Sequence, residues 1–203
     1  MVHRRRRAWH RAALPVLLVA VVTAGCTKPP GAKRPQHESA APQRTLTFSL
    51  EAKAYGKVSV RVPEQPVATA PTGTKDVTVE LYALHRAGDA VQVVFALRHP
   101  AGDYSAGEVT YDLDEDPTVA SHNASKVAIV DTARLKEYKT FRANGQDGDC
   151  LCSTTWNTTG DTGSPSSGDR SYYLAEVAAP PADVSTVTVR AGLADIAGAR
   201  IEG

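Results

Sequence analysis

The sequence has no hydrophobic run near its N-terminus that is long enough to cross a membrane as a helix. The apolar stretch there covers residues 12–24, whereas a membrane-spanning helix needs about 20 residues, and Pro15 further disfavours a helix. We therefore expect no permanent transmembrane segment. A basic cluster at residues 4–11 precedes the stretch and small residues follow it, which is the anatomy of a cleavable signal peptide covering residues 1–25.

The end of the apolar stretch carries the motif Ala24-Gly25-Cys26. It resembles the lipobox of bacterial lipoproteins, in which small residues precede an invariant cysteine, although Thr23 stands where leucine is more usual. The resemblance implies that residues 1–25 are removed and that Cys26 becomes the lipid-bearing first residue of the mature protein. Ordinary secretion with an unmodified Cys26 is the alternative.

Large apolar side chains are almost absent from residues 26–44. Four prolines and a net charge of +3 in residues 27–44 predict a flexible, semi-extended tether after the lipidated cysteine. Beside anionic lipid head groups, each basic charge would add about 1 kcal/mol to anchoring. We therefore expect a domain held at the outer face of the bacterial cytoplasmic membrane, with the membrane as a partner through the N-terminal lipid.

Basic residues are outnumbered in the part of the chain that is expected to fold. Residues 45–203 carry 14 basic and 21 acidic side chains, a net charge of −7. An acidic domain of this kind is a poor partner for nucleic acid, so we expect none. Its 159 residues match one domain of ordinary size, long enough to bury a core.

The chain also lacks the common catalytic motifs. There is no Gly-x-Ser-x-Gly elbow for a nucleophile and no glycine-rich loop that could cradle a phosphate. The acidic cluster at residues 112–116 begins like a calcium loop, but Pro117 stands where glycine is required and Asn123 where glutamate belongs. We therefore expect a protein that is not an enzyme and has no cofactor. A pair of glycosidase carboxylates would meet only in three dimensions and has no sequence pattern of its own.

Residues that bind metal ions are few. The expected domain contains only His85, His99 and His122, and no two of them have the spacing of zinc ligands. Methionine is absent after residue 1, which disfavours a copper carrier. These observations predict no resident metal.

What the expected domain has in abundance is alternation of apolar and polar residues. Successive side chains of a strand point to opposite faces of a sheet, so this period of two predicts strands with one face in the core and one in solvent. The clearest alternating segments are residues 45–50, 57–62, 77–82, 91–97, 109–113 and 186–193. Many short strands predict an all-β protein built as an antiparallel β-sandwich, with a partly closed barrel as the alternative.

Turn residues lie between these segments. The run Arg86-Ala87-Gly88-Asp89 separates two of the clearest strands and predicts a hairpin. Residues 160–169 are rich in Gly, Ser and Asp and predict an exposed loop. Residues 131–138 form the sole plausible helix, of about two turns.

Several segments occur in an order that is found elsewhere. They are residues 82–97, residues 130–138, the run Cys150-Leu151-Cys152-Ser153, and Ala179-Pro180-Pro181-Ala182 ahead of residues 187–189. In this order they resemble uncharacterised immunoglobulin-like domains of actinobacterial lipoproteins, over residues 76–191. The resemblance implies an immunoglobulin-like β-sandwich and a cell-envelope setting. It implies no activity and no site.

Cysteine is scarce, with only three residues in the chain. If Cys26 is lipidated, Cys150 and Cys152 remain as a pair, and outside the cytosol a disulfide between them is permitted. Alternate residues of an extended strand lie nearly 7 Å apart, so the chain must bend to form this bond. We expect a structural disulfide. The alternatives are a soft-metal site for Zn²⁺ or Cu⁺, a redox centre and a pair of free thiols.

Aromatic residues are also few. Trp156 is the only tryptophan after residue 25, and Tyr172 and Tyr173 follow the expected loop. These three are weak candidates for contact with a ligand, with core packing as the alternative for Trp156. We therefore expect a lipid-anchored extracytoplasmic binding or scaffolding module whose ligand is an unknown envelope protein or glycan. A redox or metal-handling lipoprotein that acts through Cys150 and Cys152 is the alternative.

Overall fold

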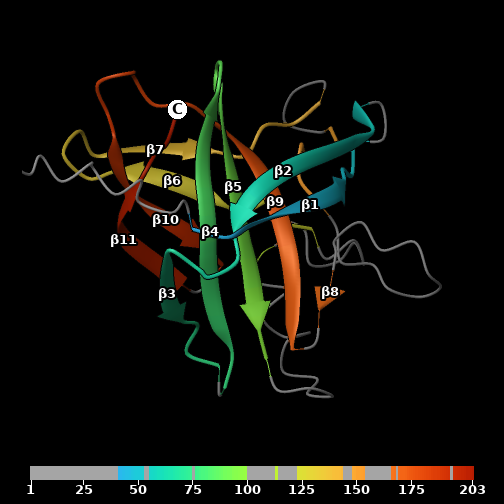
Figure 1. Ribbon diagram of the computed structural model, residues 1–203. Helices are drawn as coiled ribbons and strands as arrows, with labels where there is room; N and C mark the ends of the chain where they lie inside the picture. The colour runs from blue at the N-terminus through green and yellow to red at the C-terminus, as the bar shows by residue number, and fades with distance from the viewer. Residues whose placement is uncertain are drawn as a thin grey trace, which may run out of the picture. The chain divides into compact units, whose positions relative to one another are not determined.

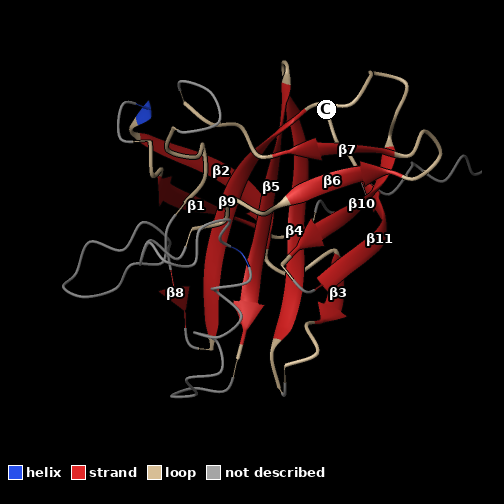
Figure 2. Cartoon of the chain, turned by 180° about the vertical axis from the view of Figure 1, so that it is seen from behind, coloured by secondary structure: helices blue, strands red, loops and turns tan. Residues whose placement is uncertain are grey.

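The computed structural model describes residues 41–52, 55–74, 76–99, 113, 123–143, 148–153, 166–167, 169–192 and 194–203. The named elements of these parts are all β-strands, every pairing between the strands is antiparallel (Figures 1 and 2), and helical geometry among the described residues is confined to the isolated positions Tyr55 and Leu113. The prediction of an all-β protein with antiparallel sheets is therefore confirmed. The expected signal peptide, Cys26, Trp156 and most of the expected strand at 109–113 lie outside the described residues.

The described residues form eleven strands: β1 (Gln43–Ser49), β2 (Lys57–Pro63), β3 (Ala68–Pro71), β4 (Thr78–Ala87), β5 (Ala90–Arg98), β6 (Ala128–Asp131), β7 (Lys136–Lys139), β8 (Ser166–Ser167), β9 (Arg170–Ala178), β10 (Thr186–Ala191) and β11 (Ala194–Arg200). They make a five-stranded sheet in the order β3-β4-β5-β9-β8, a four-stranded sheet in the order β11-β10-β6-β7, and the hairpin β1-β2. None of the three sheets is closed. The hairpin lies across one face of the five-stranded sheet, and the four-stranded sheet lies on the other face (Figures 1 and 2).

This arrangement produces two hydrophobic cores. In the main core, Val93 and Phe95 of β5 pack with Ile129 of β6 and Val189 of β10. The second core lies under the hairpin, and its members are Leu46, Phe48, Leu50, Val60, Val62, Tyr82, Val94, Ala96, Tyr172 and Leu174. The central strands of the five-stranded sheet are therefore buried on both faces.

The expectation that β5 has one solvated face is wrong. Val94 is completely buried, like its neighbour Val93, because the hairpin covers the face on which Val94 lies. A strand that is buried on both faces has apolar residues at consecutive positions, without the alternation of apolar and polar residues that marks a strand with one solvated face. The run from Val93 to Leu97 has that property.

The turn between β4 and β5 is the predicted hairpin. Ala87 pairs with Ala90, so only Gly88 and Asp89 form the loop. Gly88 has a φ of 62°, a conformation that a residue without Cβ adopts without strain. A glycine at the first of two loop positions suits the type II′ turn, whose twist matches that of the paired strands.

The predicted helix at residues 131–138 is wrong, because this segment is the turn of the β6–β7 hairpin and most of β7. The Asp131 carboxylate accepts hydrogen bonds from the backbone N–H groups of Ala133 and Arg134, both at 3.1 Å. Such a local bond fixes a turn and competes with helix formation. Pairing of Ile129 with Tyr138 then places the Tyr138 side chain in the main core, which stabilises the strand over any local preference for helix.

The loop predicted at residues 160–169 contains a short strand. Ser166 and Ser167 form β8, which pairs with the first residues of β9 at the edge of the five-stranded sheet. Serine and glycine-rich sequence gives little sign of such a strand, because a two-residue pairing needs no apolar face of its own. The remaining residues of the predicted loop, apart from Asp169 and these two serines, lie outside the described residues.

Candidate functional site

The segment Cys150-Leu151-Cys152 is hydrogen-bonded on one side to the residue that follows β1 of the hairpin and on the other side to β9 of the five-stranded sheet. The Cys152 carbonyl accepts a hydrogen bond from the N–H of Glu51 at 2.8 Å, just after β1. The Leu151 carbonyl accepts one from the N–H of Glu176 at 2.9 Å, in β9. These main-chain bonds fix the path of the segment on both sides, so the positions of its side chains are determined by the sheet.

The two cysteine side chains lie in the main core and are completely buried. Their sulfur atoms are at disulfide-bonding distance, and their Cα atoms are 5.2 Å apart. That spacing is well below the nearly 7 Å of an extended strand and falls within the range that a disulfide spans. The chain therefore makes the bend that the sequence predicts, and its geometry is consistent with the expected disulfide. Leu151 packs against the second core.

A carboxylate that the sequence analysis did not single out completes this group. Oε2 of Glu51 lies 3.0 Å from Sγ of Cys150, and it accepts hydrogen bonds from the Cys150 N–H at 3.1 Å and from Nδ2 of Asn123 at 3.0 Å. The ligand atoms of Glu51, Cys150 and Cys152 all lie within 4.8 Å of one another. Within the described parts of the chain, this is the only such convergence of three or more Cys, His, Asp or Glu side chains.

Tyr172 and Tyr173, which the sequence suggests as ligand-contacting residues, are both buried. The Tyr173 ring stacks on Phe95 in the main core, with ring centroids 5.2 Å apart. The Tyr172 ring packs edge-on against Tyr82 in the second core, at 5.4 Å. Their position in β9 places them in the cores instead of on a surface that a ligand could reach.

The Tyr172 and Tyr82 rings share one cation. The guanidinium carbon of Arg44 lies 4.6 Å from the centroid of Tyr172 and 5.2 Å from that of Tyr82, within the range of a cation–π interaction. Arg44 also donates a hydrogen bond to the Tyr172 hydroxyl. The sequence analysis places Arg44 in the basic tether, but the structure includes it in β1, which begins at Gln43.

A buried carboxylate continues this polar group. Glu80, which is 4% exposed, accepts a hydrogen bond from the Tyr82 hydroxyl at 2.9 Å and forms a two-pronged ion pair with Arg170, at 2.7 and 3.2 Å. Burial raises the pKa of Tyr82, and the hydrogen bonds to Tyr172 and Glu80 raise it further. The hydrogen bond to Glu80 raises the pKa of Arg170. The raised pKa values keep Tyr82 neutral and Arg170 charged, which preserves the hydrogen bond and the ion pair to Glu80.

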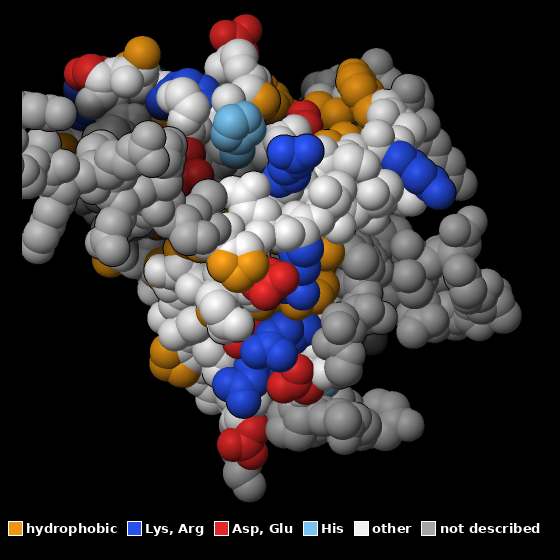
Figure 3. Space-filling view, in the orientation of Figure 1, with side chains coloured by type: hydrophobic (Ala, Val, Ile, Leu, Met, Phe, Trp, Pro, Cys, Tyr) orange, Lys and Arg blue, Asp and Glu red, His pale blue; other side chains and the backbone are white. Residues whose placement is uncertain are grey.

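The network reaches the surface at the end of the sheet. Arg170 also contacts Asp169 at 2.8 Å, and Asp169 pairs with Arg98 at 3.2 Å. Figure 3 shows Lys or Arg and Asp or Glu side chains gathered together on the face that carries β4, β5 and β9. Each carboxylate of this patch is paired with an arginine: Glu80 with Arg170, and Asp169 with both Arg170 and Arg98.

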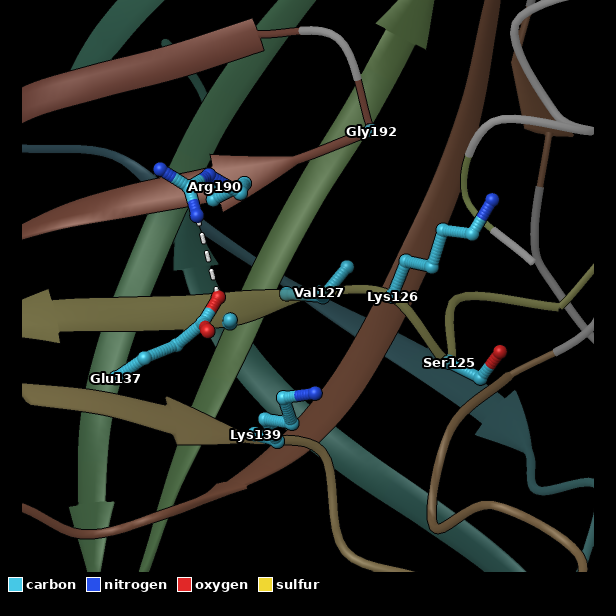
Figure 4. A pocket seen from close by; sticks show the side chains of 8 residues that line it. Ser125, Lys126, Val127, Glu137, Lys139, Arg190 and Gly192 are labelled. Atoms are coloured by element: carbon cyan, nitrogen blue, oxygen red, sulfur yellow. Dashed lines mark hydrogen bonds and ion pairs between the residues drawn. The ribbon is translucent and has the colours of Figure 1, made fainter. Parts of the chain in front are cut away.

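A different part of the surface carries excess charge. A hollow of about 210 Å³ lies over the four-stranded sheet, lined by Ser125, Lys126, Val127, Ala128, Glu137, Lys139, Arg190 and Gly192 (Figure 4). Arg190 pairs with Glu137 at 3.2 Å and with Asp195 at 3.1 Å. Hydrogen bonding to Asp195, with a smaller effect of Glu137, raises the pKa of Arg190. Lys126 and Lys139 are exposed, and no carboxylate of the described residues forms an ion pair with either.

Comparison with known proteins gives no relative for this chain. No family model matches the sequence, and neither a curated protein nor a solved structure matches it. Within the described residues, no helix has the length and apolar character needed to cross a membrane. The class that the structure defines is therefore an all-β protein made of antiparallel, unclosed sheets.

Proposed function

We propose that this protein is a lipid-anchored extracytoplasmic binding module, and that the hollow over the four-stranded sheet binds the anionic groups of a cell-envelope glycan polymer. The observation that carries the proposal is that Lys126 and Lys139, which have no carboxylate partner among the described residues, line the same hollow as Arg190. The glycan belongs to one of the two ligand classes that the sequence analysis leaves open.

The chemistry of the hollow supports an anionic ligand. Glu137 and Asp195 hold the Arg190 guanidinium in place and more than offset its charge. With Lys126 and Lys139 the five groups carry a net charge of +1, which comes from the two lysines. An ammonium group is a compact charge with three donors, and it binds a phosphate or carboxylate without a fixed geometry. A volume near 210 Å³ suits one charged group with part of a sugar ring. A polymer would therefore bind through one of its repeating charged sugar units.

The setting that the sequence predicts supports the same function. Acylation of Cys26 and a tether through residue 42 would hold the domain at the outer face of the membrane, where anionic glycan polymers are exposed. Since the domain as a whole is acidic, a local basic hollow would restrict binding to one surface. Contacts of this exposed kind weaken as salt rises.

The test uses the mature chain from residue 26, with Cys26→Ser to prevent acylation. Calorimetry should detect binding of polygalacturonate, an anionic glycan with one carboxylate on each sugar ring, and weaker or no binding of neutral dextran. Lys126→Gln together with Lys139→Gln should weaken binding by about tenfold or more, since each loses roughly 1 kcal/mol of charge attraction. Lys57→Gln removes an exposed charge from β2 and serves as the matched control. Unchanged affinity in the double variant would refute the proposal.

A further inference from the structure

We propose that Glu51, Cys150 and Cys152 bind one zinc ion when the cysteine pair is reduced. In the oxidised protein the two sulfur atoms are bonded to each other and cannot serve as thiolate ligands. Reduction therefore creates the site and oxidation removes it. None of these three residues lines the hollow over the four-stranded sheet. Zinc binding here is therefore independent of the proposed glycan binding.

The positions of the three side chains suit a single small cation. In a tetrahedral zinc site with Zn–S distances near 2.3 Å and Zn–O distances near 2.0 Å, the ligand atoms lie roughly 3.5–3.8 Å apart. The three ligand atoms here already lie within 4.8 Å of one another, with 3.0 Å between Glu51 Oε2 and Cys150 Sγ. Rotation of the cysteine side chains after reduction is therefore enough to form the site, and the backbone need not move.

The Glu51 carboxylate is fixed in place before any metal binds. Its Oε2 atom accepts hydrogen bonds from the N–H of Cys150 and the amide of Asn123. Hydrogen bonds of this kind orient a ligand and raise metal affinity.

The contact between Glu51 and Cys150 also suits the reduced state on its own. Glu51 Oε2 lies 3.0 Å from Cys150 Sγ. As a disulfide sulfur that atom has no proton to donate, whereas after reduction its S–H can donate a hydrogen bond to the carboxylate. Two thiolates beside a carboxylate in a buried site would repel one another without a cation. Zinc compensates that charge, so it should stabilise the reduced protein.

The chemistry balances with a dithiol as the reductant. The dithiol gives two electrons and two protons to the Cys150–Cys152 bond, which breaks to leave two thiols, and the reductant becomes a disulfide. Zn²⁺ then displaces the two thiol protons, which pass to solvent. The product has two thiolates, one carboxylate and one Zn²⁺, a net charge of −1. A water molecule can occupy the fourth position, as it does in zinc sites with three protein ligands.

The experiment titrates the mature chain, carrying Cys26→Ser, with zinc alone after anaerobic reduction by a phosphine and again after oxidation. The reduced chain should bind one equivalent, and the oxidised chain should bind at least about a hundredfold more weakly, since a disulfide offers no thiolate. Cobalt in place of zinc should give the absorption bands of thiolate ligation in a tetrahedral site. A reduced chain that binds no zinc, or equal binding by both forms, would overturn the inference.

Glu51→Gln tests the carboxylate. It should weaken zinc binding by about tenfold or more while the cobalt–thiolate bands remain. Glu64→Gln, an exposed change in the loop after β2, should leave the affinity unchanged. X-ray absorption on the unmodified chain gives a readout that does not depend on a variant's folding. Two sulfur and two lighter ligands are expected, and a shell with fewer than two sulfurs would contradict the site.

Discussion

Val93 and Val94 are consecutive residues of β5, point to opposite faces of the sheet, and are both completely buried. Val93 belongs to the main core and Val94 to the core beneath the hairpin. Strand β5 is therefore the shared wall of two hydrophobic cores. A substitution that disturbs β5 should therefore destabilise both cores.

Val93→Asp and Val94→Asp should each lower the free energy of unfolding by several kcal/mol, because each places a carboxylate without a partner in an apolar core. Val67→Asp, at a side chain that is 60% exposed, should change it by less than about 0.5 kcal/mol. Urea denaturation of the three variants measures the effect. If Val94→Asp were as mild as Val67→Asp, the hairpin would not cover β5 in solution.

Arg44 should stabilise the attachment of the hairpin to the sheet. Replacing it with methionine keeps much of the apolar length but removes the cation that Tyr82 and Tyr172 share, so the free energy of unfolding should fall by about 1–2 kcal/mol. Arg61→Met, an exposed change on β2, is the matched control. The two variants are compared by chemical denaturation. Equal losses would mean that the contact with the tyrosines contributes nothing specific.

Asp131 should make stability depend on pH in the acid range. Its hydrogen bond to Arg134, at 2.9 Å, holds the pKa of the Asp131 carboxyl below its ordinary value of 3.8. A carboxyl with a lowered pKa stabilises the fold at every pH above its unfolded value, and this effect is lost as the pH falls through the folded pKa. Asp131→Asn keeps the turn but lacks the charge.

The stability difference between the parent protein and Asp131→Asn should therefore be largest above about pH 5 and should shrink toward pH 2. Thermal unfolding across this range measures it. Asp89→Asn, at an exposed position of the β4–β5 turn, should show no comparable trend. A difference that stays constant with pH would show that the loss is not electrostatic.

Cys26→Ala tests the anchor that the sequence predicts. Without an acylated cysteine the protein should stay uncleaved or be released into the medium, because firm attachment needs more than one acyl chain. Membrane fractionation follows its location, and mass spectrometry of the parent protein identifies the mature N-terminus. A mature parent chain that begins at any residue other than an acylated Cys26 would contradict the prediction.

Local patterns predict much of this fold because they depend on neighbours in the chain. Phe48 and Val60 lie on alternating segments and are buried as expected, and Gly88 is in the predicted turn. The same method fails where the environment comes from elsewhere. Val94 is buried by the hairpin, and Tyr138 is part of a strand because β6 pairs with it. Neither partner is visible in a short window of sequence.

The candidate sites also combine features that a local sequence pattern reveals with contacts between residues that are far apart in the chain. The pair Cys150 and Cys152 stands out in the sequence because the two residues are close together. Glu51 is 99 residues from Cys150, and only the main-chain bonds of the Cys-Leu-Cys segment bring them together. Lys126 and Lys139 likewise line one hollow because β6 and β7 pair as a hairpin, whose turn the sequence suggests to be a helix. Long-range contacts of this kind carry no local signal.

The position of Arg44 has a mechanical consequence. It is the second residue of β1, directly after the segment that is expected to reach the membrane. A pull on the chain ahead of Gln43 first loads the bond from the Glu64 N–H to the Pro42 carbonyl and the pairing of Gln43 with Pro63. It then loads Arg44, whose bond to Tyr172 passes part of the load to β9, which is paired on both sides by β5 and β8. Force from the membrane would thus be shared between the two-stranded hairpin and the five-stranded sheet, and Arg44 would limit unzipping of the hairpin beyond its first pair.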